Sequence, residues 1–170
     1  MIILGIDPGT AATGYGVIES DKGKLKILNY GCICTDAKMD MPERLDLIAK
    51  ELKKIIKKHK PRIMAVEELF FFKNNKTIIT VGQARGVILF IGKNAGLKVC
   101  EYTPLQVKQA VVGYGRAEKK QVQQMVKAIL SLESAPKPDD AADALAVAIC
   151  CANSVKYELR IMNQEKTLSS

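Results

Sequence analysis

Histidine and paired cysteine motifs, which mark many metal-binding proteins, are almost absent from this sequence. His59 is the only histidine, and the five cysteines form no pair of CxxC motifs, so a structural zinc site is not expected. Internal repeats and low-complexity stretches are absent too. The 170 residues therefore predict one globular domain over 1–154, followed by a frayed tail over 155–170.

Long apolar runs are also missing. The apolar start of the chain leads directly into Asp7 and Pro8 and lacks the basic and apolar regions of a signal peptide. The apolar stretch over 77–91 is interrupted by Gly, Gln and Arg, so no transmembrane helix is expected. The cysteines mostly have apolar neighbours, which favours small buried side chains in a reducing cytoplasm.

Basic residues are in excess over acidic ones. The chain has 26 Lys and Arg against 18 Asp and Glu, a net charge of +8, which suits a polyanionic partner but does not prove one. A group of these lysines shares one face of the helix predicted to begin at Pro42; it consists of Lys50, Lys53, Lys54, Lys57 and Lys58. For this face the sequence favours a solvated surface, with a DNA site as the alternative.

The order of the apolar patterns predicts an α/β fold. Three short strands are expected at 2–7, 14–19 and 25–34, then a helix between Pro42 and Pro61 and a strand at 62–67. A helix over 77–94, a strand over 97–102 and helices near 104–111, 117–131 and 139–152 follow. This order indicates a mixed five-stranded sheet with helices on both faces.

Four acidic residues occupy positions at the ends of apolar strands or on the apolar stripe of a helix, where a protein core normally has hydrophobic side chains. Asp7 and Glu67 each end an apolar strand, and sites in open α/β sheets gather at the carboxyl ends of strands. Asp140 and Asp143 are three residues apart on the stripe of the last helix that becomes buried. Helix capping explains Asp139 and competes for Asp140, but it does not explain Asp143.

Crowded carboxylates repel one another unless they share protons or hold cations. No histidine or cysteine stands among these four acids, so an all-oxygen ligand set for Mg²⁺ or Mn²⁺ is favoured over a zinc site. Hard cations in an acidic cluster on a basic protein indicate phosphodiester hydrolysis assisted by two metal ions.

Five segments over residues 3–148 carry a resemblance to a known family; they read ILGIDPGTAATGYGVIE, AVEELFFFKN, GQARGV, QVKQAVVGYGRAEKKQV and DAADALAVA. In this combination the sequence resembles the RuvC family of crossover-junction endodeoxyribonucleases. The resemblance implies an RNase H-like fold and a homodimer that makes paired, Mg²⁺-dependent cuts in a four-way Holliday junction. It also implies a branch-migration motor complex of the RuvAB type as a partner.

The same resemblance implies roles for single residues. The catalytic and metal-binding acids are Asp7, Glu67, Asp140 and Asp143, with two Mg²⁺ ions per site and Mn²⁺ as a substitute. Glu68 is the rival of Glu67, because only one of two successive strand residues can face Asp7. The expected DNA-binding residues are Lys108, Lys119, Phe70, Lys73 and Arg116.

The three aromatic residues Phe70, Phe71 and Phe72 cannot all face one core from a single strand or turn. We expect one ring, Phe70 by the resemblance, to stack on an unpaired base at the crossover. Burial of all three rings is the alternative.

The helix over 77–94 is apolar on more sides than one chain can cover. Gly82 and Gly86, four residues apart, allow another helix to approach closely. We therefore expect this helix to form the interface of a two-fold symmetric dimer.

Two other classes of function stay open from the sequence. The segment DPGTAATG also resembles the phosphate loop of actin-like ATPases and sugar kinases, but those enzymes need two such domains and this chain has room for one. A junction-binding module without catalysis is the second alternative, and four intact acids argue against it.

Overall fold

A computed structural model describes the backbone of residues 1–69 and 75–168, and the side chains of residues 1–69 and 78–155. The elements are β1 (Ile2–Asp7), β2 (Ala12–Asp21), β3 (Lys24–Cys34), α1 (Met41–His59), β4 (Ile63–Glu67), α2 (Asn75–Asn94), β5 (Lys98–Tyr102), α3 (Pro104–Val112), α4 (Lys119–Ile129) and α5 (Asp139–Leu168). The sheet order is β3-β2-β1-β4-β5. Strands β1 to β3 pair antiparallel, whereas β1, β4 and β5 pair parallel, so the predicted mixed five-stranded sheet is confirmed.

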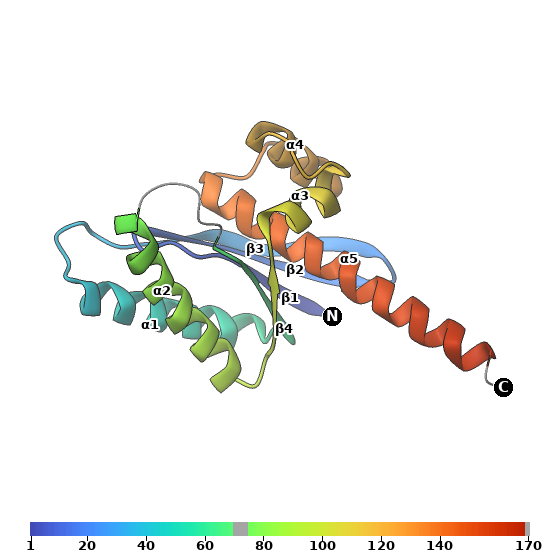
Figure 1. The fold of residues 1–170 in the computed structure, drawn as a ribbon, viewed down its shortest axis with the longest axis horizontal. Helices are drawn as coiled ribbons and strands as arrows, with labels where there is room; N and C mark the ends of the chain where they lie inside the picture. Colours follow the sequence, from blue (N-terminus) through green and yellow to red (C-terminus); the bar gives the residue numbers. More distant parts are fainter. Residues whose placement is uncertain (70–74, 169–170) are drawn as a thin grey trace.

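Helices cover both faces of this sheet. Helices α1 and α2 lie on one face, and α5 crosses the other with α3 and α4 beside it (Figure 1). A hydrophobic core lies on each face of the sheet, and β1 contributes side chains to both, because successive strand residues point to opposite faces. Leu4 and Ile6 are buried on the side of α1 and α2, and Ile3 is buried on the side of α5.

Helix α1 begins and ends where its sequence provides the signals. Asp40 accepts a hydrogen bond from the backbone N–H of Glu43, whose side chain accepts one in return from the N–H of Asp40. Pro42 occupies the first turn, and the helix ends at Lys60, which adopts the left-handed conformation. Ile48 and Leu52 on its inner face are fully buried.

Glycines on β1 and β2 let α5 lie directly on the sheet. A Cβ atom at Gly5 would overlap the carbonyl oxygen of Ala144, and one at Gly14 would overlap that of Asp140. Alanines fill the facing stripe of α5, so helix and strands approach backbone to backbone. This close approach sets the height of the first turns of α5 above the sheet.

The last helix differs from its predicted length. Its backbone continues as α5 to Leu168, across the residues for which a frayed tail was expected. Residues 153–168 contain no Pro or Gly, so nothing in the sequence stops the helix near residue 152. The limit of the nuclease domain at residue 154 stays a prediction.

The cysteines are less uniformly buried than expected. Cys150 and Cys151 are buried in α5, but Cys32 and Cys100 are only half-buried and Cys34 is exposed. Cys32 and Cys34 lie on β3, an edge strand of the sheet, which explains their exposure. Within the described residues, no helix has the length and apolar character needed to cross a membrane.

Replacing Gly5 with Ala tests the contact between α5 and the sheet. The added methyl group has no space beneath Ala144, so we expect the free energy of unfolding to fall by ~1–3 kcal/mol, the usual cost of overpacking a core. Urea unfolding followed by circular dichroism measures this loss. An unchanged midpoint would contradict the backbone-close packing of α5.

Candidate active site

The carboxyl ends of β1 and β4 bring two acids together. These strands are parallel and Ile6 pairs with Val66, so Asp7 and Glu67 follow side by side. Both side chains point to the face covered by α5, as Ile3 and Ile63 do in the same strands. The two carboxyl groups are close enough to interact. Glu67, rather than its rival Glu68, is thus the acid that faces Asp7.

The first turns of α5 add the second pair of acids. The backbone of Asp140 lies over Gly14, and Gly14 is the neighbour of Asp7 across β1 and β2. Asp143 lies one turn further along and lines a cavity of about 210 Å³ together with Glu67, Lys108 and Lys119. The four predicted acids, from three separate elements, therefore meet at one edge of the sheet.

This gathering makes Asp7, Glu67 and Asp143 harder to ionise. Burial, and then repulsion from Glu67, Asp143 and Asp140, raises the pKa of Asp7 to about 8. Burial and repulsion from Asp143 raise the pKa of Glu67 to about 7. Burial also raises the pKa of Asp143, although Lys119 opposes the shift. The site holds protons at neutral pH when no metal ion offsets its negative charge.

Lys119 is ion-paired with the acids at the start of α5. Its Nζ atom lies 2.9 Å from Asp143 and 3.5 Å from Asp139. Burial acts to lower the pKa of Lys119, but hydrogen bonding and attraction to Asp143, then to Asp139, outweigh it and raise the pKa. Lys119 is the first residue of α4, where the helix dipole disfavours a positive charge. The acids, rather than its own helix, account for its position.

The other predicted DNA-binding residues fall in different places. Lys108 lines the same cavity as Glu67 and Asp143. Arg116 instead lines a separate groove of about 610 Å³ on the other side of α3, together with Tyr102 and Tyr114. Phe70 and Lys73, with the neighbouring Phe71 and Phe72, lie outside the described residues, and their roles stay predictions.

Arg85 is a residue that the sequence did not single out as part of the site. From α2 its Nε donates a hydrogen bond to the backbone carbonyl of Glu67, at 3.3 Å, and its Nη2 pairs with Glu101 of β5. Only 20% of its side chain is exposed. The strand ends at Glu67, so this carbonyl needs a donor from another element. Arg85 belongs to the segment GQARGV, which is part of the family resemblance. The sequence does not show that this arginine contacts Glu67 and Glu101.

Cys32 also lies closer to the site than expected. It pairs with Gly14 across β2 and β3, beside Asp7 and Asp140. Burial, and then its interaction with Cys34, raises the pKa of the thiol to about 12. A thiol that stays protonated at neutral pH is a poor metal ligand, so Cys32 leaves the oxygen-only character of the donor set unchanged.

The donor set fits a hard divalent cation. Four carboxylates supply only oxygen ligands, and repulsion among them adds to burial in raising the pKa of Asp7 and Glu67. Among the described residues, no three His, Cys, Asp or Glu side chains already converge as ligands of one ion. Asp143 is ion-paired with Lys119. The acidic side chains would therefore have to turn toward a metal ion in order to bind it together.

Acids at the carboxyl ends of β1 and β4 and on a helix laid across the same mixed sheet define the class of protein: a nuclease with an RNase H-like fold. The family model described as crossover junction endodeoxyribonuclease RuvC matches residues 3–151. The chain therefore belongs to the RuvC family.

Individual RuvC proteins are similar in sequence to this chain over nearly its whole length. The crossover junction endodeoxyribonuclease RuvC of Syntrophomonas wolfei is 60% identical over 92% of this chain and 91% of its own length. That of Fusobacterium nucleatum is 55% identical over 94% of this chain and 84% of its own length.

Solved structures agree as well. The structure of Thermus thermophilus RuvC has a TM-score of 0.86 at 37% identity, covering 93% of this chain and 97% of that one. The structure of the same protein in complex with Holliday junction substrate has a TM-score of 0.85 at 34% identity, covering 92% and 96%. The yeast mitochondrial resolvase Ydc2, at 14% identity and a TM-score of 0.67 over 95% of this chain and 85% of that one, shares the fold.

Replacing Arg85 with Met tests whether this residue positions Glu67. We expect the single-turnover cleavage rate to fall ~10–100-fold with junction affinity unchanged, because a small displacement of a catalytic group has effects of this size. The conservative variant Arg85→Lys should recover part of the rate. Glu101→Gln is the matched control, because it removes the ion pair but leaves the donor to Glu67, and its rate should stay near wild type. Equal rates for the Met variant and the wild type would exclude the positioning role.

Proposed function

We propose that this chain resolves Holliday junctions in DNA recombination and repair by paired hydrolytic cuts, as a metal-dependent endodeoxyribonuclease. The observation that carries the proposal is that Asp7, Glu67, Asp140 and Asp143 lie near one another at one edge of the sheet, with two lysines lining the cavity beside Glu67 and Asp143. Membership of the RuvC family over residues 3–151 supports it, as does the likeness to a relative solved with Holliday junction substrate. The nuclease domain spans residues 1–154 in this proposal.

In this proposal the acidic residues of the site bind metal ions and the basic residues bind phosphate groups. Asp7, Glu67, Asp140 and Asp143 would hold two Mg²⁺ ions, for which Mn²⁺ substitutes. When bound, such ions lower the pKa of the attacking water and stabilise the leaving oxygen of the phosphodiester. Lys108 and Lys119 line the cavity and attract the phosphate group to it. Lys119 exchanges its ion pair with Asp143 for a phosphate oxygen when DNA arrives.

Three further residues complete the proposed DNA interface. Arg116, in the groove on the far side of α3, contacts a phosphate further along the strand. Phe70 stacks on an unpaired base at the crossover, and Lys73 contacts the backbone beside it.

Helix α2 would join two copies of the chain. Ala84, Ile88 and Ile91 on one side of it are buried against the sheet and α1. On another side Ile79 and Phe90 are 67% and 69% exposed. Within the described part of the chain, nothing beyond the backbone of α2 itself lies within 4 Å of the position that a Cβ would take at Gly82 or Gly86, so this side has room for a second helix. A two-fold symmetric dimer matches a substrate that needs two symmetric cuts.

The remaining parts of the proposal rest on family membership. A branch-migration motor complex of the RuvAB type delivers the junction, in the cytoplasm where the chromosome is found. A phosphate-binding domain of the actin-like or sugar-kinase type is not favoured, because the RuvC match takes up the whole domain. A junction-binding module without catalysis is not favoured either, because all four acids lie together.

Replacing Asp7 with Asn tests the catalytic proposal. This change keeps the size of the side chain but removes a negative metal ligand, so cleavage of a labelled four-way junction in Mg²⁺ should fall more than about 100-fold, beyond the usual effect of an outer-shell residue. Junction binding should persist, because losing a carboxylate does not weaken attraction for phosphates. Ca²⁺ should support binding by the wild type with little cutting. Wild-type protein that leaves the junction intact in Mg²⁺ would overturn the proposed function, whereas equal loss of binding in the variant would make Asp7 structural.

Replacing Phe90 with Glu tests the proposed dimer. The side chain is 69% exposed within one copy, so the fold should tolerate the charge. Across a two-fold interface the same charge would be buried and unpaired, so the mass measured by sedimentation should shift from dimer to monomer at micromolar concentration. Lys24→Glu, an exposed change at the start of β3 and away from α2, is the control. A wild-type protein that is already a monomer contradicts the proposed interface.

A further inference from the structure

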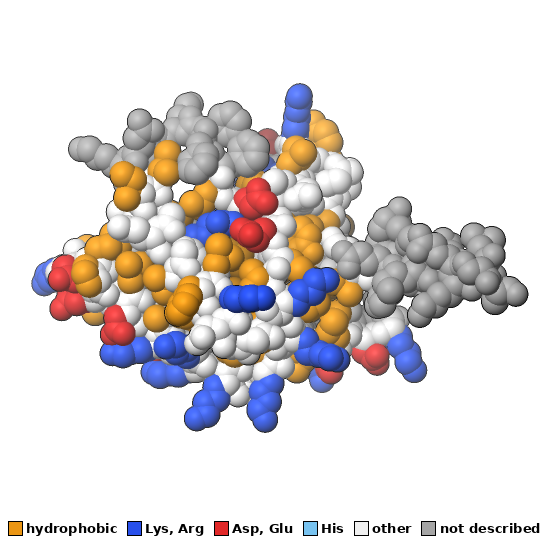
Figure 2. Space-filling model, turned by 60° about the horizontal axis from the view of Figure 1, so that its bottom comes forward, with side chains coloured by type: hydrophobic (Ala, Val, Ile, Leu, Met, Phe, Trp, Pro, Cys, Tyr) orange, Lys and Arg blue, Asp and Glu red, His pale blue; other side chains and the backbone are white. Residues whose placement is uncertain are grey.

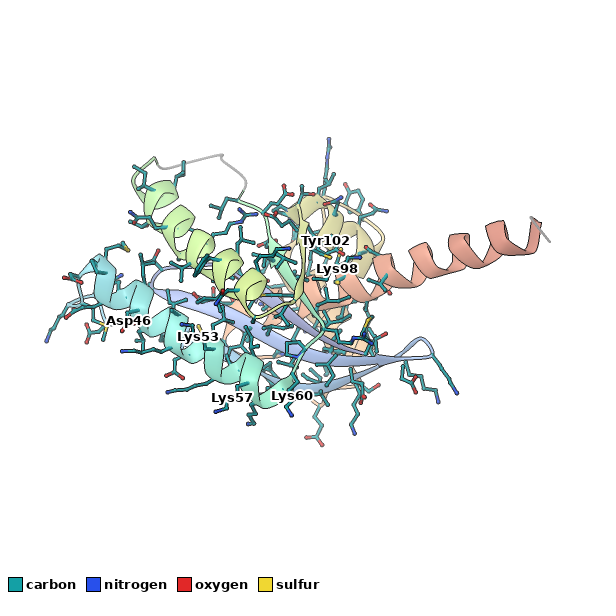
Figure 3. All side chains as sticks on the ribbon, turned by 90° about the horizontal axis from the view of Figure 1, so that it is seen from below. Asp46, Lys53, Lys57, Lys60, Lys98 and Tyr102 are labelled. Atoms are coloured by element: carbon teal, nitrogen blue, oxygen red, sulfur yellow. The ribbon has the colours of Figure 1, made fainter. Side chains whose placement is uncertain are left out.

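A second basic region lies far from the catalytic acids. It consists of exposed side chains on α1, on the turn after it and on β3: Lys53, Lys57, Lys58, Lys60, Arg62 and Lys26. We name this set the distal basic surface. Figure 2 shows basic side chains spread over the lower part of this view with few acidic ones among them, and Figure 3 shows Lys53, Lys57 and Lys60 following one another toward the end of α1.

The lysines of α1 fall into two groups. Lys50 and Lys54 each have an acidic partner, Asp46 and Glu51, at 2.6 Å. In the described ranges no ion pair forms at Lys53 or Lys57, although these residues lie on the same helix. From residue 53 to residue 62 the chain has six basic residues and no acidic one. Positive charge therefore accumulates toward the C-terminal end of α1, and apart from Lys54 the lysines there have no ion pair among the described residues.

The helix dipole explains only part of this accumulation. Cations stabilise the last turn of a helix, which accounts for Lys57 and Lys58. The effect fades beyond that turn, so it does not account for Lys53, nor for Lys26 and Arg62 outside the helix. Like charges four residues apart, such as Lys53 and Lys57, also destabilise a helix. A surface kept only for solubility would not need this arrangement.

Backbone pairing joins the residues outside the helix to the same side of the molecule. The N–H of Arg62 donates to the carbonyl of Ile2, Ile2 pairs with Glu19, and Glu19 pairs with Lys26. This row lies at the strand ends opposite Asp7 and Glu67. Glu19 is the half-buried acid within the row, and it offsets one of the positive charges. The rest of the surface remains strongly positive.

The distal basic surface lies on a different side of the molecule from the acids that are proposed to cut the DNA. Arg62 and Glu67 are separated by five residues of extended chain, ~16 Å at ~3.3 Å per residue. The surface is also on the α1 side of the sheet, whereas the acids face α5. A phosphate chain in the catalytic cavity and one on the distal surface therefore lie on opposite sides of the protein.

We propose that the distal basic surface binds a second DNA duplex, separate from the junction in the active site, through its phosphates and without reading its sequence. Lys53 to Lys60 cover ~10 Å of helix axis, over which a duplex presents about six phosphate charges. Such contact holds the enzyme on neighbouring DNA while it acts. The inference rests on the proposed function in one respect, which is that the polyanion bound by this surface is taken to be DNA.

The test measures capture of a second duplex by protein that is already bound to a junction. An Asp7→Asn background prevents cutting, and a short-armed junction fixed to a surface is saturated with protein before a labelled linear duplex is added. The test variant is Lys53→Gln with Lys57→Gln. The matched control is Lys50→Gln with Lys54→Gln, which removes equal charge from the same helix at lysines that already have acidic partners. Gln and Lys have similar helix propensities, so both variants should fold.

We expect capture by the test variant to fall at least fivefold, with the slope of log affinity against log salt lowered by about two. The control should change less than twofold. Equal losses in both variants would reduce the effect to net charge and overturn the proposal, as would an absence of capture by the unsubstituted surface. Junction cleavage in the wild-type Asp7 background is measured alongside. Cutting without capture refutes this proposal alone, whereas a junction left uncut refutes the proposed function.

Discussion

Repulsion among four carboxylates at one partly buried edge of the sheet is the constraint on which the rest of this structure depends. The packing of α5 creates it, because Gly5 and Gly14 let the helix backbone lie on β1 and β2 and thereby bring Asp140 and Asp143 to Asp7. Burial and crowding then raise the pKa values of Asp7 and Glu67. Without a cation, protons and Lys119 offset this charge; with divalent ions bound, the same crowding becomes a ligand set.

Each helix or strand around the acids positions different residues of the site. Strands β1 and β4 end in acids, and α3 and α4 place lysines beside them. Helix α2 reaches the site from the other face through Arg85, which holds the carbonyl of Glu67. Because α2 is also the proposed dimer helix, the proposed assembly and the position of Glu67 depend on the same element. The distal basic surface, on α1, the turn after it and β3, lies away from the acids and is the proposed contact for a second duplex.

Much of the fold followed from local sequence patterns, because strands and helices are encoded in alternation and helical spacing. The pairing of Asp7 with Glu67 could be predicted from two apolar strands that each end in an acid, and the face of Asp143 from its spacing to Asp140. The role of Arg85 could not, because its partners lie in β4 and β5 and the contact depends on tertiary packing. The length of α5 was also missed, since no residue after Asn153 marks a helix end.

Calorimetry of Mg²⁺ binding tests the central claim most directly, because metal ions must displace protons from carboxyl groups with raised pKa values. The pKa of Asp7 is raised to about 8 and that of Glu67 to about 7, so both hold protons below these values and lose them above. Titrations in buffers of different ionisation heat should show proton release near pH 7, and little release at pH 9, where the acids are already ionised. The Asp7→Asn variant should release fewer protons. Binding of Mg²⁺ near pH 7 with no dependence on the buffer would contradict the account.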